Sequence, residues 1–199
     1  MAANAGRRAT RGTNARGRNT YAHLQRVALE LFLRDGYEAT TVDVIVAEAG
    51  VSRRTFFHHF QTKLDVLWGD SFDELSRFSQ LLWARREPDI RDALLAAIVE
   101  HGEGGQYDEV DLLRFQVVRA SDLAASYAAT WQVEMRRTLG AWLADRSGRT
   151  DDDPGVRAAA AALEALRGFV VEEWAASGGQ ANVGELASAA LDVVDIDLT

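Results

Sequence analysis

The stretch from Gly50 to Phe60 constrains the fold of this chain more than any other. Gly50 can adopt the positive φ that a sharp corner between two helices requires. Ser52 can accept a hydrogen bond from a free backbone N–H of the next turn, as helix N-caps do. A short helix after Ser52 would carry Arg53 and Arg54 on its first turn. A short helix with a basic, polar outer face is what the major groove of DNA accepts.

The residues before this stretch complete a helix-turn-helix pattern. Thr40 or Thr41 can cap a first helix over residues 42–49, whose apolar side chains recur at spacings of three and four. Two helices joined by a short turn containing glycine are typical of the DNA-binding motif. All-α proteins that never touch DNA also contain such pairs, so the spacing alone leaves both interpretations open.

A family resemblance favours the DNA-binding interpretation. Residues 21–68 resemble the N-terminal domain of the TetR family of bacterial transcriptional repressors. The matching segments are Ala28 to Phe32, Gly36 to Val42, Ile45, Ala49 to Ser52, Thr55 to Phe60, and Lys63. The resemblance implies an all-α protein with an N-terminal three-helix helix-turn-helix domain. It also implies a C-terminal helical domain for ligand binding and dimerisation.

Composition excludes several other classes of protein. The chain has 199 residues, 47% of them hydrophobic, which is enough for a sizeable core, and it has no cysteine for a disulfide or a thiolate metal site. It shows no signal-peptide pattern and no apolar run of eighteen residues, so we expect a cytoplasmic protein with no membrane partner. We find no phosphate-loop, zinc-protease or nucleophile-elbow motif, and expect no enzyme activity, metal or cofactor.

The net charge of −8 is unevenly distributed. Residues 1–68 hold ten basic and six acidic residues, a net charge of +4, whereas the remaining 12 basic and 24 acidic residues give −12. A basic N-terminal segment on an acidic body is expected if one end of the protein meets phosphate.

Three regions follow from these patterns. Residues 1–19 are rich in arginine and lack apolar periodicity, so we expect a disordered basic arm whose Arg16 and Arg18 contact phosphate or the minor groove. The alternative is a solvated tail. We expect the helix-turn-helix domain over residues 20–68 and the ligand-binding and dimerisation domain over residues 69–199. The boundary lies within one predicted helix, residues 62–86, which would link the two domains.

Chemistry and the resemblance together assign the candidate DNA contacts. Threonines at a helix N-terminus suit a phosphate, and arginines suit guanine O6 and N7. The resemblance places Lys63 where family members direct a lysine at a phosphate. The family often has a phenol at the position of Phe57, which has no hydroxyl. The candidate residues are Arg16, Arg18, Thr40, Thr41, Ser52, Arg53, Arg54, Thr55, Phe57, His58, His59 and Lys63.

The C-terminal half reads as a series of amphipathic helices. Residues 156–194 are rich in alanine, and small residues allow helices to approach closely. The resemblance implies that two helices here form a homodimer as a four-helix bundle; the alternative is that they only close the monomer core. A dimer would place two recognition helices about 34–36 Å apart on palindromic double-stranded DNA.

Large aromatic residues could line a ligand pocket in this half, although such stripes more often form a core. The candidates are Phe78, Trp83, His101, Phe115, Arg119, Tyr127 and Trp131. The chain also resembles regulators of the mycofactocin-system type, in the residues Arg53 to Phe57, Lys63 to Asp70 and Leu112 to Arg119. Members of that group respond to acyl-CoA thioesters, which implies a slot for an acyl tail.

The sequence therefore predicts a dimeric repressor that a small apolar ligand, such as acyl-CoA, releases from a palindromic operator. Two alternatives remain open at this point. A helical-bundle enzyme would keep its activity when Arg53 and Arg54 are replaced. A sequence-indifferent DNA-binding protein would bind every duplex with similar affinity, whereas a repressor prefers its site by about 10³-fold or more.

Overall fold

The computed structural model describes residues 15–68, 71–103 and 107–194, and every regular element among them is a helix. The all-α prediction is therefore confirmed. The chain divides into two compact units. The N-terminal unit contains Met1–Phe72 and Leu113–Ser126, and the C-terminal unit contains Asp73–Leu112 and Tyr127–Thr199. A single boundary near residue 68 did not anticipate that the N-terminal unit draws on two separate segments of the chain.

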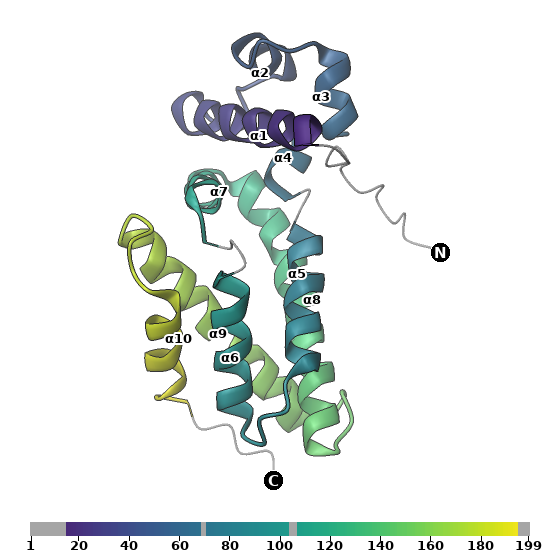
Figure 1. Cartoon of the computed structure of the whole chain (residues 1–199), viewed down its shortest axis with the longest axis vertical. Helices are drawn as coiled ribbons and strands as arrows, with labels where there is room; N and C mark the ends of the chain where they lie inside the picture. The colour runs from purple at the N-terminus through teal and green to yellow at the C-terminus, as the bar shows by residue number, and fades with distance from the viewer. Residues whose placement is uncertain (1–14, 69–70, 104–106, 195–199) are drawn as a thin grey trace. The chain divides into compact units, whose positions relative to one another are not determined.

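The N-terminal unit begins with α1, Ala15–Asp35 (Figure 1). Its inner face is formed by Leu24, Ala28 and Phe32, all of which are buried and recur at a spacing of four residues. The helix starts earlier than the predicted residue 20, so residues 15–19 are not part of a disordered arm. Once a helix is nucleated, each further residue adds a hydrogen bond at little cost, and alanine and arginine are good helix formers. Residues 1–14 of the predicted arm lie outside the described part of the chain.

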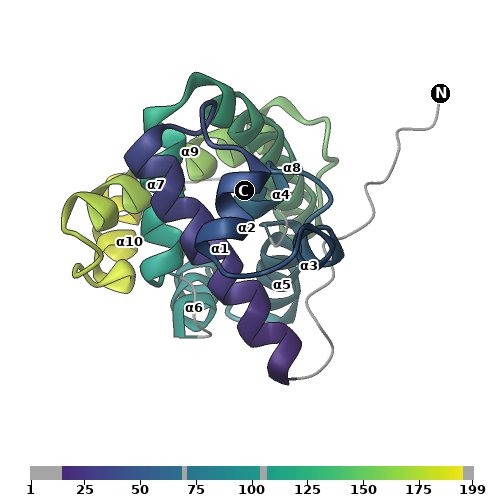
Figure 2. The same ribbon diagram turned by 90° about the horizontal axis from the view of Figure 1, so that it is seen from above.

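Two glycine corners shape the rest of this unit. Gly36, at φ 90°, ends α1, and Gly50, at φ 65°, lies between α2, Val42–Glu48, and α3, Arg53–His59. The backbone N–H of Val51 donates to the Val46 carbonyl at 3.0 Å and closes the second corner. Figures 1 and 2 show α2 and α3 beside α1. This is the predicted three-helix arrangement.

An aromatic core holds α3 against α1. Phe56 and Phe60 are completely buried, and their ring centres lie 5.5 Å apart. Tyr21 of α1 lies over Phe60, with ring centres 4.7 Å apart. The packing of these large buried rings therefore fixes the orientation of α3 relative to α1. It also fixes the direction in which the exposed side of α3 points.

The structure describes helix on both sides of residues 69–70: α4, Asp65–Trp68, and α5, Ser71–Ala84. The helix predicted to begin near Thr62 begins instead at Asp65. The carboxylate of Asp65 accepts hydrogen bonds from the backbone N–H groups of Gln61 and Thr62, at 2.8 and 2.9 Å, and these bonds stabilise the preceding turn.

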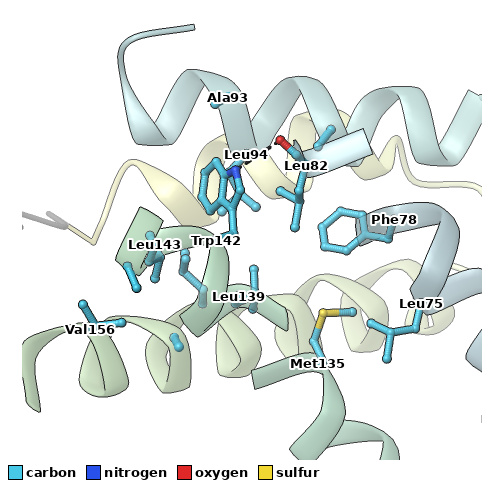
Figure 3. Packing of buried hydrophobic residues seen from close by; sticks show 14 of the residues in the cluster. Leu75, Phe78, Leu82, Ala93, Leu94, Met135, Leu139, Trp142, Leu143 and Val156 are labelled. Carbon is cyan, nitrogen blue, oxygen red and sulfur yellow. Dashed lines mark hydrogen bonds between the residues drawn. The ribbon is translucent and has the colours of Figure 1, made fainter. Parts of the chain in front are cut away.

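The remaining helices are α6, Ile90–Glu103, α7, Glu109–Ala120, α8, Asp122–Ser147, α9, Pro154–Ala176, and α10, Val183–Leu191. In the C-terminal unit, α10 lies beside α9 and α6 (Figure 1). The core is centred on Trp142 of α8, whose indole N–H donates to the Leu82 carbonyl of α5 at 3.1 Å (Figure 3). Phe78, Met135 and Leu139 belong to the same buried cluster.

No helix within the described ranges is long and apolar enough to cross a membrane. Nor do His, Cys, Asp or Glu residues in that part of the chain form a group of three or more that could hold a metal ion.

Candidate functional site

The outer face of α3 presents four predicted DNA contacts together. Arg53, Arg54, Phe57 and His58 are exposed, while Phe56 faces inward. Residues at positions i, i+1, i+4 and i+5 share one side of a helix, because each turn contains 3.6 residues. The result is a short helix whose exposed side carries two guanidinium groups and two rings.

An ion pair with Asp43 of α2 holds the side chain of Arg53 on α3. Its Nη1 atom lies 2.5 Å from Oδ1 of Asp43 on α2, and its guanidinium lies 5.8 Å from the centre of the Phe57 ring. More than half of each charged side chain is exposed, at 58% and 66%. Exposed pairs of this kind contribute only about 0–1 kcal/mol to stability. Arg53 can therefore exchange Asp43 for another acceptor at little cost.

Hydroxyl groups cap both helices of the motif. The Thr41 side chain accepts from the backbone N–H of Val44 at 3.3 Å, and the Ser52 side chain accepts from that of Thr55 at 3.0 Å. The Ser52 and Thr55 hydroxyls are 2.8 Å apart. Thr41 and Ser52 are exposed and Thr55 is half-buried. These caps set where each helix starts; contact with DNA stays a prediction.

Two predicted DNA contacts require correction. His59 is only 3% exposed, and its ring packs edge-on against Tyr21, with ring centres 6.1 Å apart. Thr40 is 2% exposed, and its hydroxyl donates to the Gly36 carbonyl at 2.8 Å. Both side chains face the interior of the N-terminal unit, where DNA cannot reach them. Their roles are to pack α3 on α1 and to tie the loop before α2 to the end of α1.

Lys63 also has a structural role where a phosphate contact was predicted. Its ammonium donates to the carbonyls of Tyr37 and Thr40, at 2.5 and 2.9 Å, with a longer contact to that of Glu38 at 3.4 Å. It also lies 4.3 Å from the centre of the Tyr37 ring. Burial lowers the pKa of Lys63. An ammonium has three donors, and this loop occupies all of them.

The basic residues at the start of α1 are partly described. Arg18 is exposed on the first turn of the helix, rather than on a disordered arm as predicted. Arg16 lies in the same turn, and its side chain is outside the described part of the structure.

Sequence reasoning missed a hydrogen bond that joins the two segments of the N-terminal unit. The Ser121 hydroxyl donates to Oε1 of Glu38 at 2.6 Å, and its oxygen accepts from the backbone N–H of Ala124 at 3.2 Å. Ser121 thus caps α8 and anchors the loop between α1 and α2. The hydrogen bond lowers the pKa of Glu38. The two residues are 83 positions apart, so no local pattern could have indicated the pair.

The predicted ligand residues fall into both units. Phe115 and Arg119 belong to the N-terminal unit, with the guanidinium 5.9 Å from the phenyl centre. In the C-terminal unit, Phe78 is buried and Trp131 is half-buried. Trp83 is 44% exposed, and its contact with a ligand stays a prediction. The side chain of Tyr127 is outside the described part of the structure.

His101 is the most perturbed of the predicted ligand residues. Its ring lies edge-on to Phe78, with ring centres 5.4 Å apart, and its Nδ1 atom is buried without a hydrogen-bond partner. Burial, aided by the positive charge of Arg77, lowers the pKa of His101 to about 4. The imidazole is therefore neutral at pH 7 and offers a polar atom in an apolar setting.

Comparison with known proteins agrees with this geometry. Residues 24–67 match the model of the family described as "Bacterial regulatory proteins, tetR family". The HTH-type transcriptional regulator TcmR of Streptomyces glaucescens is 33% identical over 172 residues, which cover 79% of this chain and 74% of that protein. The chain belongs to the tetR family.

Other tetR-type proteins show the same likeness over most of the chain. The "Putative mycofactocin biosynthesis transcriptional regulator MftR" of Mycobacterium tuberculosis is 28% identical over 181 residues, covering 88% of this chain and 89% of that one. The fold resembles that of SmeT in its triclosan complex, with a TM-score of 0.65, 18% identity and coverage of 87% and 88%. It also resembles NalD of Pseudomonas aeruginosa, with a TM-score of 0.62, 18% identity and coverage of 90% and 95%.

Membership of the tetR family confirms that the chain is a transcriptional regulator with a helix-turn-helix DNA-binding domain, in which α2 and α3 form the motif. The helical-bundle enzyme is thereby set aside, because the family and the matched relatives are regulators.

Proposed function

We propose that this tetR-family regulator represses transcription by binding a palindromic operator as a homodimer, and that a small apolar ligand in the C-terminal unit releases it. The exposed face of α3 carries the proposal. It brings Arg53 and Arg54 to the surface on a helix short enough for the major groove, and arginine matches the O6 and N7 acceptors of guanine.

On DNA, Arg53 would exchange the Asp43 carboxylate for a base edge, because their exposed ion pair costs little to break. Asp43 also neutralises Arg53 in the free protein, which weakens binding to phosphates of arbitrary sequence. Phe57 and His58 would lie against sugar and phosphate, and the hydroxyls of Thr41 and Ser52 would meet the backbone. Arg18, with Arg16, would add phosphate contacts beside the motif.

The homodimer would form through residues 156–194. The outer side of α9 carries exposed Ala158, Ala161 and Ala165, followed by Phe169, which is 48% exposed. These positions recur at spacings of three and four, so they share one face of the helix. Small side chains allow a second copy of the helix to approach closely, and Phe169 provides apolar area to bury.

The ligand would occupy the C-terminal unit near Phe78, His101 and Trp131, which combine apolar surface with a neutral imidazole. Acyl-CoA is the proposed ligand because of the resemblance to mycofactocin-system regulators. Binding would shift the segment of α4 and α5 and alter the spacing of the two recognition helices. Linkage then requires DNA to weaken ligand affinity by the same factor.

Fluorescence anisotropy tests the DNA-binding part of this proposal. The purified protein is titrated with the duplex flanking its own gene and with random duplex, at two salt concentrations. We expect a preference of about 10³-fold or more for the operator. The double variant Arg53→Ala/Arg54→Ala should lose that preference. Arg136→Ala/Arg137→Ala is a matched control, because it removes two adjacent exposed arginines from α8.

Equal affinity for operator and random duplex would support the sequence-indifferent alternative. Loss of the preference in both double variants would show that overall charge, rather than the face of α3, determines binding.

A further inference from the structure

We infer that Arg167 in the C-terminal unit binds the carboxylate of a ligand with a flat or extended apolar body. The inference rests on the proposed function, since it names a class of ligand for this unit: a free carboxylic acid, in place of a CoA thioester, which has no carboxylate. Arg167 lies on α9, and its guanidinium carbon is 4.2 Å from the centre of the Trp131 ring on α8. Its Nη2 atom is 3.5 Å from Oε1 of Glu164, one turn earlier on α9.

The hydrogen-bonding capacity of Arg167 is poorly used. A guanidinium has five N–H donors in a planar fork. The contact with Glu164 is long and involves a single nitrogen, and the Nε atom of Arg167 is buried without a hydrogen-bond partner. Buried cations are normally paired and hydrogen-bonded, because leaving their donors unsatisfied is costly. A planar anion at the edge of this guanidinium would remove the deficit.

Tyr107, from the loop before α7, extends this arrangement. Its ring packs edge-on against Trp174 of α9, with ring centres 5.5 Å apart, and its phenol is close enough to feel the charge of Arg167. Among the non-glycine residues of the described chain, only Tyr107 has a positive φ, 66°. Strained backbone of this kind clusters at ligand sites. Burial raises the pKa of Tyr107, so its hydroxyl stays protonated and can donate.

These groups are crowded by protein yet still accessible to solvent. Burial lowers the pKa of Arg167, but its side chain is still 25% exposed to solvent. Trp131 and Tyr107 are likewise half-buried. The Arg167 guanidinium is therefore packed against other side chains and can still be reached from solvent.

The chemistry of these side chains indicates a carboxylic acid. Trp131 packs over one face of the Arg167 guanidinium, and the planar fork of a guanidinium matches a carboxylate with two parallel hydrogen bonds. Tyr107 provides a neutral donor beside it. The half-buried ring of Trp131 provides apolar surface for the body of the ligand. Glu164 balances the charge of Arg167 until the ligand arrives.

The test compares acids with their uncharged amides on the full-length protein. Isothermal titration calorimetry measures the binding of octanoate, decanoate and 2-naphthoate, and of octanamide, decanamide and 2-naphthamide. We expect at least one acid to bind ten or more times as tightly as its amide. Arg167→Met should abolish this preference, whereas Arg137→Met, an exposed arginine on α8, should retain it.

Two further variants distinguish a loss of acid binding from misfolding of the variant protein. Arg167→Lys keeps the charge but loses the fork, so it should weaken acid binding with less disturbance of the fold. Trp131→Phe keeps the ring and should preserve acid binding, while removing the part of the tryptophan fluorescence change that the acid produces. Circular dichroism checks that each variant is folded.

The inference is overturned if no acid binds more tightly than its amide, or if Arg167→Met and Arg137→Met keep the same preference. In either case Arg167 and Glu164 form only a structural ion pair. DNA anisotropy separates this outcome from failure of the proposed function. Release of operator DNA by acyl-CoA without any acid preference would leave the proposed function standing and remove this site. Acid binding without any effect on DNA would do the reverse.

Discussion

Lys63 shows how one long side chain can hold a loop in place. Its ammonium donates to the carbonyls of Tyr37 and Thr40, so the loop from α1 to α2 closes around a positive charge. That loop determines where α2 begins, and α2 in turn carries Asp43, the partner of Arg53. The lysine therefore influences the DNA-binding face without being part of it.

We expect Lys63→Met to lower the free energy of unfolding by about 1.5–2 kcal/mol, the lower part of the range for hydrogen bonds to charged groups, because Lys63 is half-exposed. Urea denaturation measures this, with Arg54→Met as the control that should leave stability unchanged. If stability is unaffected and the salt dependence of operator binding falls instead, Lys63 contacts phosphate as the sequence first indicated.

His101 predicts a pH dependence of stability. Its pKa is about 4 in the folded protein and 6.5 in an unfolded chain, so between these values the unfolded state binds one more proton. Stability should therefore fall as the pH drops from about 6.5 towards 4, in addition to losses from carboxylate protonation. His101→Phe should reduce this slope by about one proton in urea titrations at a series of pH values. An unchanged slope in His101→Phe would contradict the assignment.

Individual residues also show what the sequence could and could not predict. The exposure of Arg53, Arg54 and His58 follows from helical periodicity once α3 is recognised. His59 and Thr40 are polar and were assigned to the DNA face, but they are buried, because polarity alone does not say which side of a short helix a residue occupies. The contacts of Lys63 span 23 to 26 residues, so no local pattern contains them.

At the scale of helices, Ser121 connects the start of α8 to the loop between α1 and α2. We expect Ser121→Ala to lower the free energy of unfolding by about 1 kcal/mol through loss of the cap. It should also raise the pKa of Glu38, because the hydrogen bond that lowers it is gone. Thermal or urea unfolding and NMR titration of Glu38 measure the two effects.

Ser126→Ala is the matched control, since Ser126 is exposed on the same helix and its hydroxyl donates only to the Leu123 carbonyl within that helix. If both serine variants behave alike, Ser121 is no more than an ordinary helical residue.

The helices themselves were largely predictable. The predicted series of amphipathic helices in the C-terminal half is present, and the expected two-helix motif is present as α2 and α3. The beginning of α1 was placed too late, since a run rich in arginine and glycine lacks the apolar periodicity that marks a helix. The beginning of the helix near Thr62 was placed too early, because the side chain of Asp65 stabilises a turn there instead.

At the scale of the whole molecule, the proposed homodimer makes Phe169 a sensitive position. A charge placed on the apolar outer face of α9 would be buried without a partner in the dimer, so Phe169→Glu should yield monomers. Monomers cannot engage both halves of a palindrome, so operator affinity should fall by at least tenfold. Analytical ultracentrifugation and DNA anisotropy measure the two effects.

Val133→Glu is the control for this experiment, because Val133 is an equally apolar exposed residue, 40% accessible, on α8. A dimer that survives Phe169→Glu but not Val133→Glu would move the interface away from residues 156–194.

The discontinuous make-up of the N-terminal unit bears on the construction of chimeric regulators. Joining the first 72 residues to the sensor of another protein would omit Leu113–Ser126, and with it the serine that tethers Glu38. The sensor of the other protein would have to provide a junction between two of its helices with a side chain that replaces Ser121 as the partner of Glu38. A modular exchange that respects this protein's architecture therefore transplants two stretches of sequence, one from each side of the intervening helices.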